Sequence, residues 1–551
     1  MNIFEHRLCI FAFYSRLSIL LLQFVSNFLV PDHDAKVFNP PPELDDNSWL
    51  DQLVLYFVGG LRRWDAVYFT HIMQYGYTYE NCVAFFPFYP LLVSNFSKAF
   101  SFGLLNFSSC LLLVGVVVNI LLFVATSLVL YRLGKLVLST DKEAFYASLL
   151  FCINPASIFM TALYSEVLFS FLLFSGLLAL NHDKKILSAF LIGLSIFTRS
   201  NGLIAIGFIA HLIIKSSIHK FLKLKATSVK CSSIFSLVFK TVIEVLFYSF
   251  ICVIPFFIFQ YYIYVLYCKS SPDWPKHVID YGRSKGYKLA GDEPSLWCNE
   301  TIPLSYSYIQ KHHWNVGFLT YYTLKQLPNF LLALPVLLLS FRACSFYIKN
   351  NVMLFCFLGL TCSNNNGSSG SSHVDISDSN REDEKQRNRF LLDKKIENYA
   401  GGQWDEVNSN KKLKCEKNSC RQTDLIVYVY HLAFLTIFGC FFMHIQVLTR
   451  MLFSSSPLLY WYVGTLFING SRRFKPSSPA DKKTREAESF KQGINLPQFL
   501  QSLLSLFKLT FISEAFKNWY CLNGEFRAIF VYFLTYSVLG TVMFSNFLPW
   551  T

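Results

Sequence analysis

The feature that most constrains this chain is a series of apolar runs that recurs along nearly its whole length. A helix needs about 20 apolar residues to cross a bilayer. The first run, Leu8–Val30, carries a single charge, Arg16. No small-residue cleavage site follows this run, so we predict a retained anchor rather than a signal peptide. Further runs lie at 104–130, 145–159, 163–180, 186–197, 203–214, 245–267, 318–339, 425–447, 458–468 and 526–547.

Several of these runs are only about 12–15 residues long, which is too short for an independent membrane span. Non-helical backbone at membrane depth is tolerated where it is buried in protein or lines a cavity. The composition agrees with a membrane protein, because 15% of the residues are charged, whereas soluble domains carry about 25%. We therefore predict an all-α polytopic membrane protein, a helical bundle with short or re-entrant helices.

The charge pattern of the loops predicts which ends of the helices share a face. The formal net charge is +14, but the basic residues form no face with interleaved aromatics, so we expect no nucleic-acid partner. Loops rich in Lys and Arg lie at 131–142, 181–185, 215–230 and 471–485, and the positive-inside rule places them in the cytoplasm. Alternation then places four elements together on the other face: the region around Asp65, the turns at Glu166 and Arg199, and the loop Lys269–Asn315.

Two polar stretches divide the chain into regions. Residues 363–424 are rich in Ser, Asn and Gly and then charged, and residues 471–495 are basic. We interpret the first as a solvated, disordered insert and the second as a linker. This division gives an N-terminal transmembrane catalytic region at 1–362, with external loops at about 31–103 and 268–317, and a C-terminal transmembrane region at 425–551.

The densest candidate motif surrounds Asp65, where an acid follows Arg63 and Trp64 at the boundary between a loop and an apolar run. A carboxylate in such a place loses solvation and becomes a candidate general base. Glu80 is an alternative base, or a residue that orients a substrate. A structural salt bridge with the neighbouring arginines, inside an aromatic interface belt, explains the same residues without catalysis.

Three further segments carry charged or polar residues at the ends of apolar runs. Glu166 begins one run, and Arg199 and Asn201 lie in a break between two others. Arg450 occupies a comparable position near another run. An arginine there suits an anionic phosphate, whereas the structural alternatives are a helix N-terminal acid and snorkelling arginines.

The loop at 268–317 contains further candidates. Trp314 follows two adjacent histidines, which cannot easily face one metal from a helix, so we predict a polar-aromatic gate over a substrate and no metal site. Cys268 and Cys298 bracket the loop and can pair in an oxidising compartment. Asn299 begins a glycosylation sequon in the same loop.

Several of these motifs, taken in order, resemble the GPI mannosyltransferase 2 family, whose members add the second mannose of the glycosylphosphatidylinositol (GPI) anchor. The similarity covers most of the chain apart from residues 363–424 and 471–495. The segments that carry it are Arg63–Ala66, Gly76–Glu80, Ala84–Pro87, Asn154–Ser157, Tyr164–Glu166, Thr198–Gly202, Trp314–Phe318 and Asn546–Thr551.

The resemblance implies a GT-C-type glycosyltransferase of the endoplasmic reticulum membrane, with its catalytic loops in the lumen. The implied donor is dolichyl-phosphate mannose, and the implied acceptor is mannosylated glucosaminyl-acyl-phosphatidylinositol, which would gain an α-1,6-linked mannose. The family's proposed catalytic acid maps onto Asp65. We expect no cofactor, contacts with membrane lipids, and room for a small membrane partner subunit.

From the residues and the family resemblance together, we expect an inverting reaction with Asp65 as general base. The candidate substrate-binding residues are Arg63, Trp64, Glu80, Glu166, Arg199, Asn201, Trp314 and Arg450. Other interpretations are a transporter or lipid scramblase, a different transferase that uses lipid-linked sugars, and a non-catalytic subunit. Transporters often show inverted repeats, but the motif around Asp65 has no counterpart in the second half of the sequence.

Overall fold

The computed structural model describes residues 2–35, 37–40, 48–100, 103–225, 231–360, 425–473, 496–506 and 508–550. These residues are mostly helical, and none of them forms a β-strand. Seven of the described helices are long and apolar enough to cross a membrane. An eighth span is formed if two helices that meet at a 73° bend, Ile445–Ser455 and Pro457–Gly470, are counted together. The prediction of an all-α polytopic membrane protein is confirmed.

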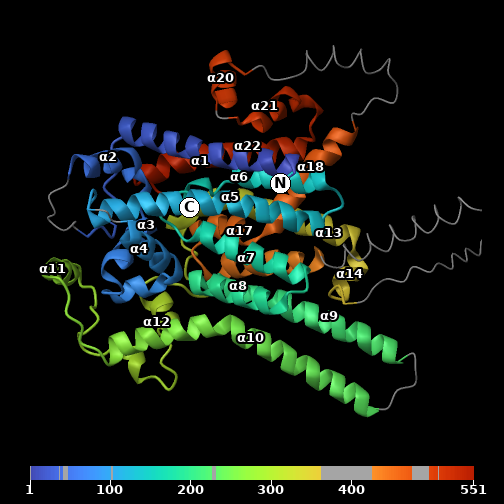
Figure 1. The fold of residues 1–551 in the computed structure, drawn as a ribbon, viewed down its shortest axis with the longest axis horizontal. Helices are drawn as coiled ribbons and strands as arrows, with labels where there is room; N and C mark the ends of the chain where they lie inside the picture. The colour runs from blue at the N-terminus through green and yellow to red at the C-terminus, as the bar shows by residue number, and fades with distance from the viewer. Residues whose placement is uncertain are drawn as a thin grey trace, which may run out of the picture.

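The long helices lie side by side as a bundle (Figure 1). The predicted N-terminal anchor is α1 (Ile3–Leu29), which packs against α5 and α22. The second apolar run becomes α5 (Phe107–Val137), which also contacts α6 and α7. The other long elements are α9 (Ile206–Lys225), α10 (Cys231–Cys268), α13 (Leu327–Asn350), the helix Leu425–Phe442, and α22 (Gly524–Ser545).

Short helices fill the middle of the bundle, as the short apolar runs predicted. They are separated by breaks, and helix ends next to these breaks, such as Cys152 and Glu166, are buried inside the protein. These elements are α6 (Asp141–Cys152), the 3₁₀ turn η3 (Ser157–Met160), α7 (Glu166–Asn181), α8 (Lys185–Thr198), the 3₁₀ turn η4 (Ser200–Ala205), α17 (Leu448–Ser455) and α18 (Pro457–Arg473).

Arg16 of α1 stabilises the break after α6. Its fully buried guanidinium donates 2.8 Å hydrogen bonds to the carbonyl oxygens of Cys152 and Ser157, and it lies 3.8 Å from the centre of the Phe123 ring. A broken helix leaves carbonyl groups without partners, and such groups are costly to bury. The charge that interrupts the first apolar run therefore satisfies the backbone of another helix.

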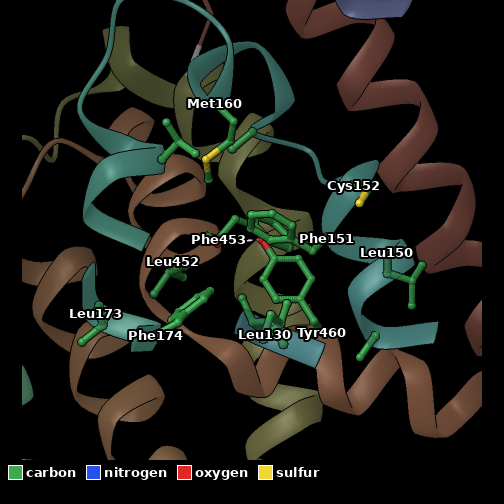
Figure 2. Packing of buried hydrophobic residues seen from close by; sticks show 14 of the residues in the cluster. Leu130, Leu150, Phe151, Cys152, Met160, Leu173, Phe174, Leu452, Phe453 and Tyr460 are labelled. Atoms are coloured by element: carbon green, nitrogen blue, oxygen red, sulfur yellow. Dashed lines mark hydrogen bonds between the residues drawn. The ribbon is translucent and has the colours of Figure 1, made fainter. Parts of the chain in front are cut away.

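Aromatic packing joins the short helices to their neighbours (Figure 2). Phe151 of α6 meets the edge of the Tyr460 ring of α18 at a centroid distance of 5.3 Å. The Tyr460 hydroxyl donates a 2.6 Å hydrogen bond to the carbonyl of Phe453 in α17. A buried phenol usually finds a partner of this kind, and here the bond fixes the bend between α17 and α18.

One end of the bundle gathers the loop-borne elements α2 (Trp49–Val58), α3 (Asp65–Tyr75), α4 (Phe88–Phe100), α11 (Lys276–Lys285) and α12 (Ser305–His312) (Figure 1). A disulfide between Cys268 and Cys298 closes the loop that contains α11. This loop packs against the segment after α3 through an isolated bridge between Tyr79 and Leu289. The elements that alternation placed on one face thus lie together.

One apolar run is shifted relative to its prediction. We expected a helix from Phe318, but α13 begins at Leu327. Leu319 adopts a φ of 58° and donates its backbone N–H to the carbonyl of Phe441, so the chain turns here before the helix starts. The predicted insert at 363–424 lies outside the described residues, as does the predicted linker after Arg473.

Candidate active site

A cavity of about 200 Å³ lies at the end of the bundle where the short helices meet the disulfide-bearing loop. Asp65, Arg199, Asn201, Trp314 and Arg450 all line it. These five predicted site residues come from four separate parts of the sequence, because Arg199 and Asn201 share one segment. Its other lining residues include residues 84–86, 198, 200, 443, 444, 446 and 447 and the loop residues Tyr306, Gln310 and Val316.

Asp65 is the first residue of α3 and follows a turn with unusual backbone geometry. Trp64 has a φ of 56° and a ψ of −128°, a conformation that a non-glycine residue rarely adopts. The backbone N–H of Asp65 donates a 3.0 Å hydrogen bond to the hydroxyl of Tyr164. A carboxylate in the first turn of a helix is also favoured by the helix dipole. The turn and the tyrosine together fix the start of α3 at the cavity.

Arg450 of α17 joins the two acids of the site. Its Nη2 lies 2.7 Å from Oδ2 of Asp65, and its Nη1 lies 3.7 Å from Oε1 of Glu166. The guanidinium also lies over the rings of Phe159 and Tyr164, at 5.3 and 5.4 Å from their centroids. Such cation–π contacts add to the ion pairs, so Arg450 is held in the cavity wall from several sides.

Glu166 is the first residue of α7 and is fully buried directly behind the cavity. Its Oε1 lies 2.5 Å from Nη1 of Arg199, which ends α8 and also bonds to the hydroxyl of Ser165. A buried carboxylate is costly unless it is paired. Glu166 is therefore a counter-ion for both arginines, and it does not itself line the cavity.

The formal charges of the two acids and the two arginines described above sum to zero, but some N–H donors of the arginines have no partner. The Nε atoms of Arg199 and Arg450 are buried without a hydrogen-bond partner among the described residues. Both side chains keep a small exposed fraction, 17% for Arg199 and 13% for Arg450. Guanidinium groups bind phosphate through paired N–H donors. This side of the cavity is suited to an anionic group.

The opposite wall comes from the disulfide-bearing loop and is aromatic and polar. Tyr306 donates a 2.6 Å hydrogen bond to the hydroxyl of Ser200, and the indole N–H of Trp314 donates to the carbonyl of Asn81. Asn201 donates its amide to the hydroxyl of Ser455 at 2.8 Å. The loop is thereby tied to the short helices and to the segment after α3. Trp314 lines the cavity, and its role in a gate over a substrate stays a prediction.

Glu80 lies outside the cavity wall and fastens this loop. Its two carboxylate oxygens are each 2.9 Å from a nitrogen, Nε1 of Trp297 and Nε2 of His313. Burial by itself would raise the pKa of Glu80, but the hydrogen bonds, led by the one from His313, outweigh burial and hold the pKa below its usual value. The structure thus gives Glu80 a role in holding the loop that contributes Trp314.

Arg63 and Trp64 also lie beside the cavity rather than in its wall. Arg63 forms a 2.8 Å ion pair with Asp32 and contacts the C-terminal end of the chain. The indole of Trp64 packs against Phe547 with a ring centroid distance of 6.1 Å. Their predicted substrate contacts stay predictions, since both side chains face neighbouring segments here.

Sequence reasoning did not single out Tyr164, Tyr306 or Gln310 as site residues. Tyr164 lies two residues before Glu166, in one of the segments that carry the family resemblance, and this proximity could have identified it as a site residue. Tyr306 and Gln310 lie on α12, and only the fold brings that helix to the cavity. The His, Cys, Asp and Glu side chains of the described residues form no cluster of three that could hold a metal ion.

Comparison with known proteins decides the family. A sequence profile described as Mannosyltransferase (PIG-V) matches residues 5–551. The chain belongs to this family. It is 35% identical to GPI alpha-1,6-mannosyltransferase 2 of Cricetulus griseus and to that of Homo sapiens, in each case over 98% of this chain and 97% of the relative. GPI mannosyltransferase 2 of Drosophila melanogaster is 30% identical over 98% of both chains. No solved structure matches.

The predicted resemblance is thus confirmed, and the chain is a glycosyltransferase of the PIG-V mannosyltransferase family. This membership supports the interpretation as a transferase over the interpretations as a transporter or a non-catalytic subunit. The cavity described above is the place where an acid, two arginines and a polar-aromatic wall meet in this family member.

Proposed function

We propose that this protein transfers a mannosyl residue from dolichyl-phosphate mannose to the 6-hydroxyl of the first mannose of a GPI precursor, forming an α-1,6 linkage. The single observation that carries the proposal is the meeting of Asp65, Arg199 and Arg450 at one cavity in a chain whose relatives are named GPI alpha-1,6-mannosyltransferase 2.

Asp65 is the general base of the proposed reaction. Its Oδ2 pairs with Arg450 at 2.7 Å, and its side chain lines the cavity. The carboxylate accepts the proton of the acceptor 6-hydroxyl as that oxygen forms a bond to the anomeric carbon of the donor. The bond between the anomeric carbon and the phosphate oxygen breaks on the opposite side, so the β configuration of the donor becomes α in the product.

Arg199 and Arg450 receive the charge that develops on the leaving group. The departing dolichyl phosphate gains one negative charge as the bond breaks, and preorganised cationic donors stabilise such a charge in a site with little water. Arg450 touches both Asp65 and Glu166, so it can bind phosphate without leaving the base. The step as proposed needs no cofactor, because the leaving group is a monophosphate with two arginines beside it.

The compartment is part of the same proposal. The disulfide of Cys268 and Cys298 supports an oxidising environment for the loop that lines the cavity. A polytopic protein with its cavity at that end suits an active site in the lumen of the endoplasmic reticulum, where a lipid-linked donor stays in the bilayer and its sugar reaches the cavity. The small membrane partner subunit stays a prediction.

Reconstitution tests this proposal directly. Purified protein in vesicles receives dolichyl-phosphate mannose and the GPI precursor that carries one mannose, and the product is digested with a linkage-specific mannosidase. We expect a two-mannose product that an α-1,6-specific enzyme cleaves. The Arg199→Lys variant keeps the charge but loses the forked donor pair, so we expect a higher KM for the donor and an unchanged KM for the acceptor. A different linkage, or a sugar taken from a soluble nucleotide donor, would overturn the proposal.

A further inference from the structure

The C-terminal segment Ser545–Trp550 reaches the turn that precedes Asp65. The ring of Phe547 lies 4.7 Å from the guanidinium carbon of Arg63 and 6.1 Å from the ring of Trp64. The carbonyl of Ser545 accepts a 3.3 Å hydrogen bond from Nε of Arg63. The two residues immediately before Asp65 are thus both held by a segment more than 480 positions away in the sequence.

Arg63 connects this segment to the N-terminal part of the chain. Its Nη2 lies 2.8 Å from Asp32 and 3.2 Å from the amide oxygen of Asn27, and its Nη1 donates to the carbonyl of Gly59 at 3.1 Å. The donors of Arg63 are therefore used by protein groups. A side chain so occupied is suited to holding backbone segments together rather than to binding a phosphate.

The C-terminal segment is itself firmly placed. Asn546 is fully buried and donates a 2.7 Å hydrogen bond to the hydroxyl of Ser26, while its carbonyl accepts the backbone N–H of His33 at 2.9 Å. Trp550 packs directly on Gly540 of α22, where an added Cβ would lie only 2.5 Å from the indole. Both ends of the segment are thus fixed against helices of the bundle.

The turn needs such support because of its backbone. The positive φ of Trp64 is unfavourable for a residue with a side chain and persists only where the surroundings enforce it. If Trp64 relaxed toward an ordinary conformation, the start of α3 would rotate and carry the Asp65 carboxylate away from the cavity. A displacement of about 1 Å at a reacting group can cost about a hundredfold in rate.

We propose that Ser545–Trp550 is a positioning clasp, which holds the Arg63-Trp64 turn and through it the orientation of Asp65. The inference rests on the proposed role of Asp65 as general base. Phe547 and Arg63 do not line the cavity, so they are positioning residues, and their loss affects turnover rather than substrate affinity.

The test compares Phe547→Leu with Phe547→Tyr in the full-length protein reconstituted in vesicles. Leu keeps an apolar side chain but loses the ring over Arg63 and Trp64, whereas Tyr keeps the ring. We expect the Leu variant to lose at least about tenfold in kcat with unchanged KM for both substrates, and the Tyr variant to retain kcat. Val538→Ala, at an exposed position of α22, is the matched control and should match the unsubstituted protein.

A double-mutant cycle separates positioning from general destabilisation. Phe547→Leu and Arg63→Lys act on the same turn, so their losses in kcat should be less than additive, at equal amounts of folded protein. If the Leu variant does not accumulate, Gly540→Ala, which displaces Trp550, should reproduce the loss in kcat. Full kcat in Phe547→Leu, or strict additivity with Arg63→Lys, would overturn the clasp. Activity in Asp65→Asn would instead overturn the base, whatever Phe547 does.

Discussion

The buried ion pair between Glu166 and Arg199 makes a prediction whose size follows from the structure. The pair is separated by 2.5 Å, and Glu166 has no exposed side-chain surface. Two unit charges about 4 Å apart interact by about 4 kcal/mol at the effective dielectric of a partly buried site. Removing one member of a buried pair costs about 3–5 kcal/mol, because the other charge loses its partner.

We therefore expect Glu166→Gln and Arg199→Gln each to lower the free energy of unfolding by about 3 kcal/mol. The lower end applies because Arg199 and Arg450 reach the cavity and the ion pair between Arg450 and Asp65 remains in both variants. The double variant removes both charges, and we expect it to recover about 1–3 kcal/mol relative to the sum of the single losses. Transfer activity should not recover, because the phosphate-binding arginine is absent.

The assay is unfolding of the purified protein in mixed micelles, followed by intrinsic fluorescence as denaturing detergent increases. Lys185→Gln is the matched control, because the Lys185–Glu244 pair is at a similar 2.8 Å but both side chains are partly exposed; we expect a loss of no more than about 1 kcal/mol. Strict additivity of the Glu166 and Arg199 losses would refute the reasoning, since it would mean that the two charges do not stabilise one another.

Three further predictions concern the loop that forms one cavity wall. The pKa of Glu80 is held below its usual value of 4.5, so its stabilising contribution to loop docking is present above that pH and is lost as the pH falls through the lowered pKa. Limited proteolysis of the loop should therefore become faster in acid. The acceleration should be smaller in Glu80→Gln, which has no carboxylate to protonate. Cys268→Ser opens a disulfide with a sequence separation of 30, which should destabilise the loop by about 3–4 kcal/mol and raise the KM for at least one substrate. Unchanged KM values for both substrates would contradict a substrate-binding wall built by this loop. Asn299 is exposed in this loop, so the protein should carry a glycan there, and Asn299→Gln should abolish the gel shift produced by endoglycosidase; a protein without that glycan would count against a lumenal loop.

Much of the fold was predictable because apolar runs and loop charges act locally. The anchor α1 and the long helix α5 follow directly from run length. The prediction that Asp65, Glu166 and Arg199 share one end of the bundle also held, because strict alternation of helices leaves them no other place. Membrane physics supplies these constraints before any tertiary contact is known.

What the sequence could not supply are contacts between distant segments. Arg16 looked like an interruption of an apolar run, yet its role depends on carbonyl groups about 140 positions away. Glu80 was an expected substrate-binding residue, and only the folded loop shows its bonds to Trp297 and His313. The side chain of Arg63 is occupied by both ends of the chain, which no local pattern encodes.

The most direct test of the account is the turnover of Asp65→Asn in vesicles supplied with dolichyl-phosphate mannose and the one-mannose GPI precursor. Asn has nearly the same shape but cannot accept the proton of the attacking hydroxyl. Positioned proton transfer contributes about 10²–10⁴-fold to rate, so we expect kcat to fall by at least about a hundredfold while the amount of folded protein stays unchanged. A variant that turns over at nearly the normal rate would show that the carboxylate of Asp65 is not the base.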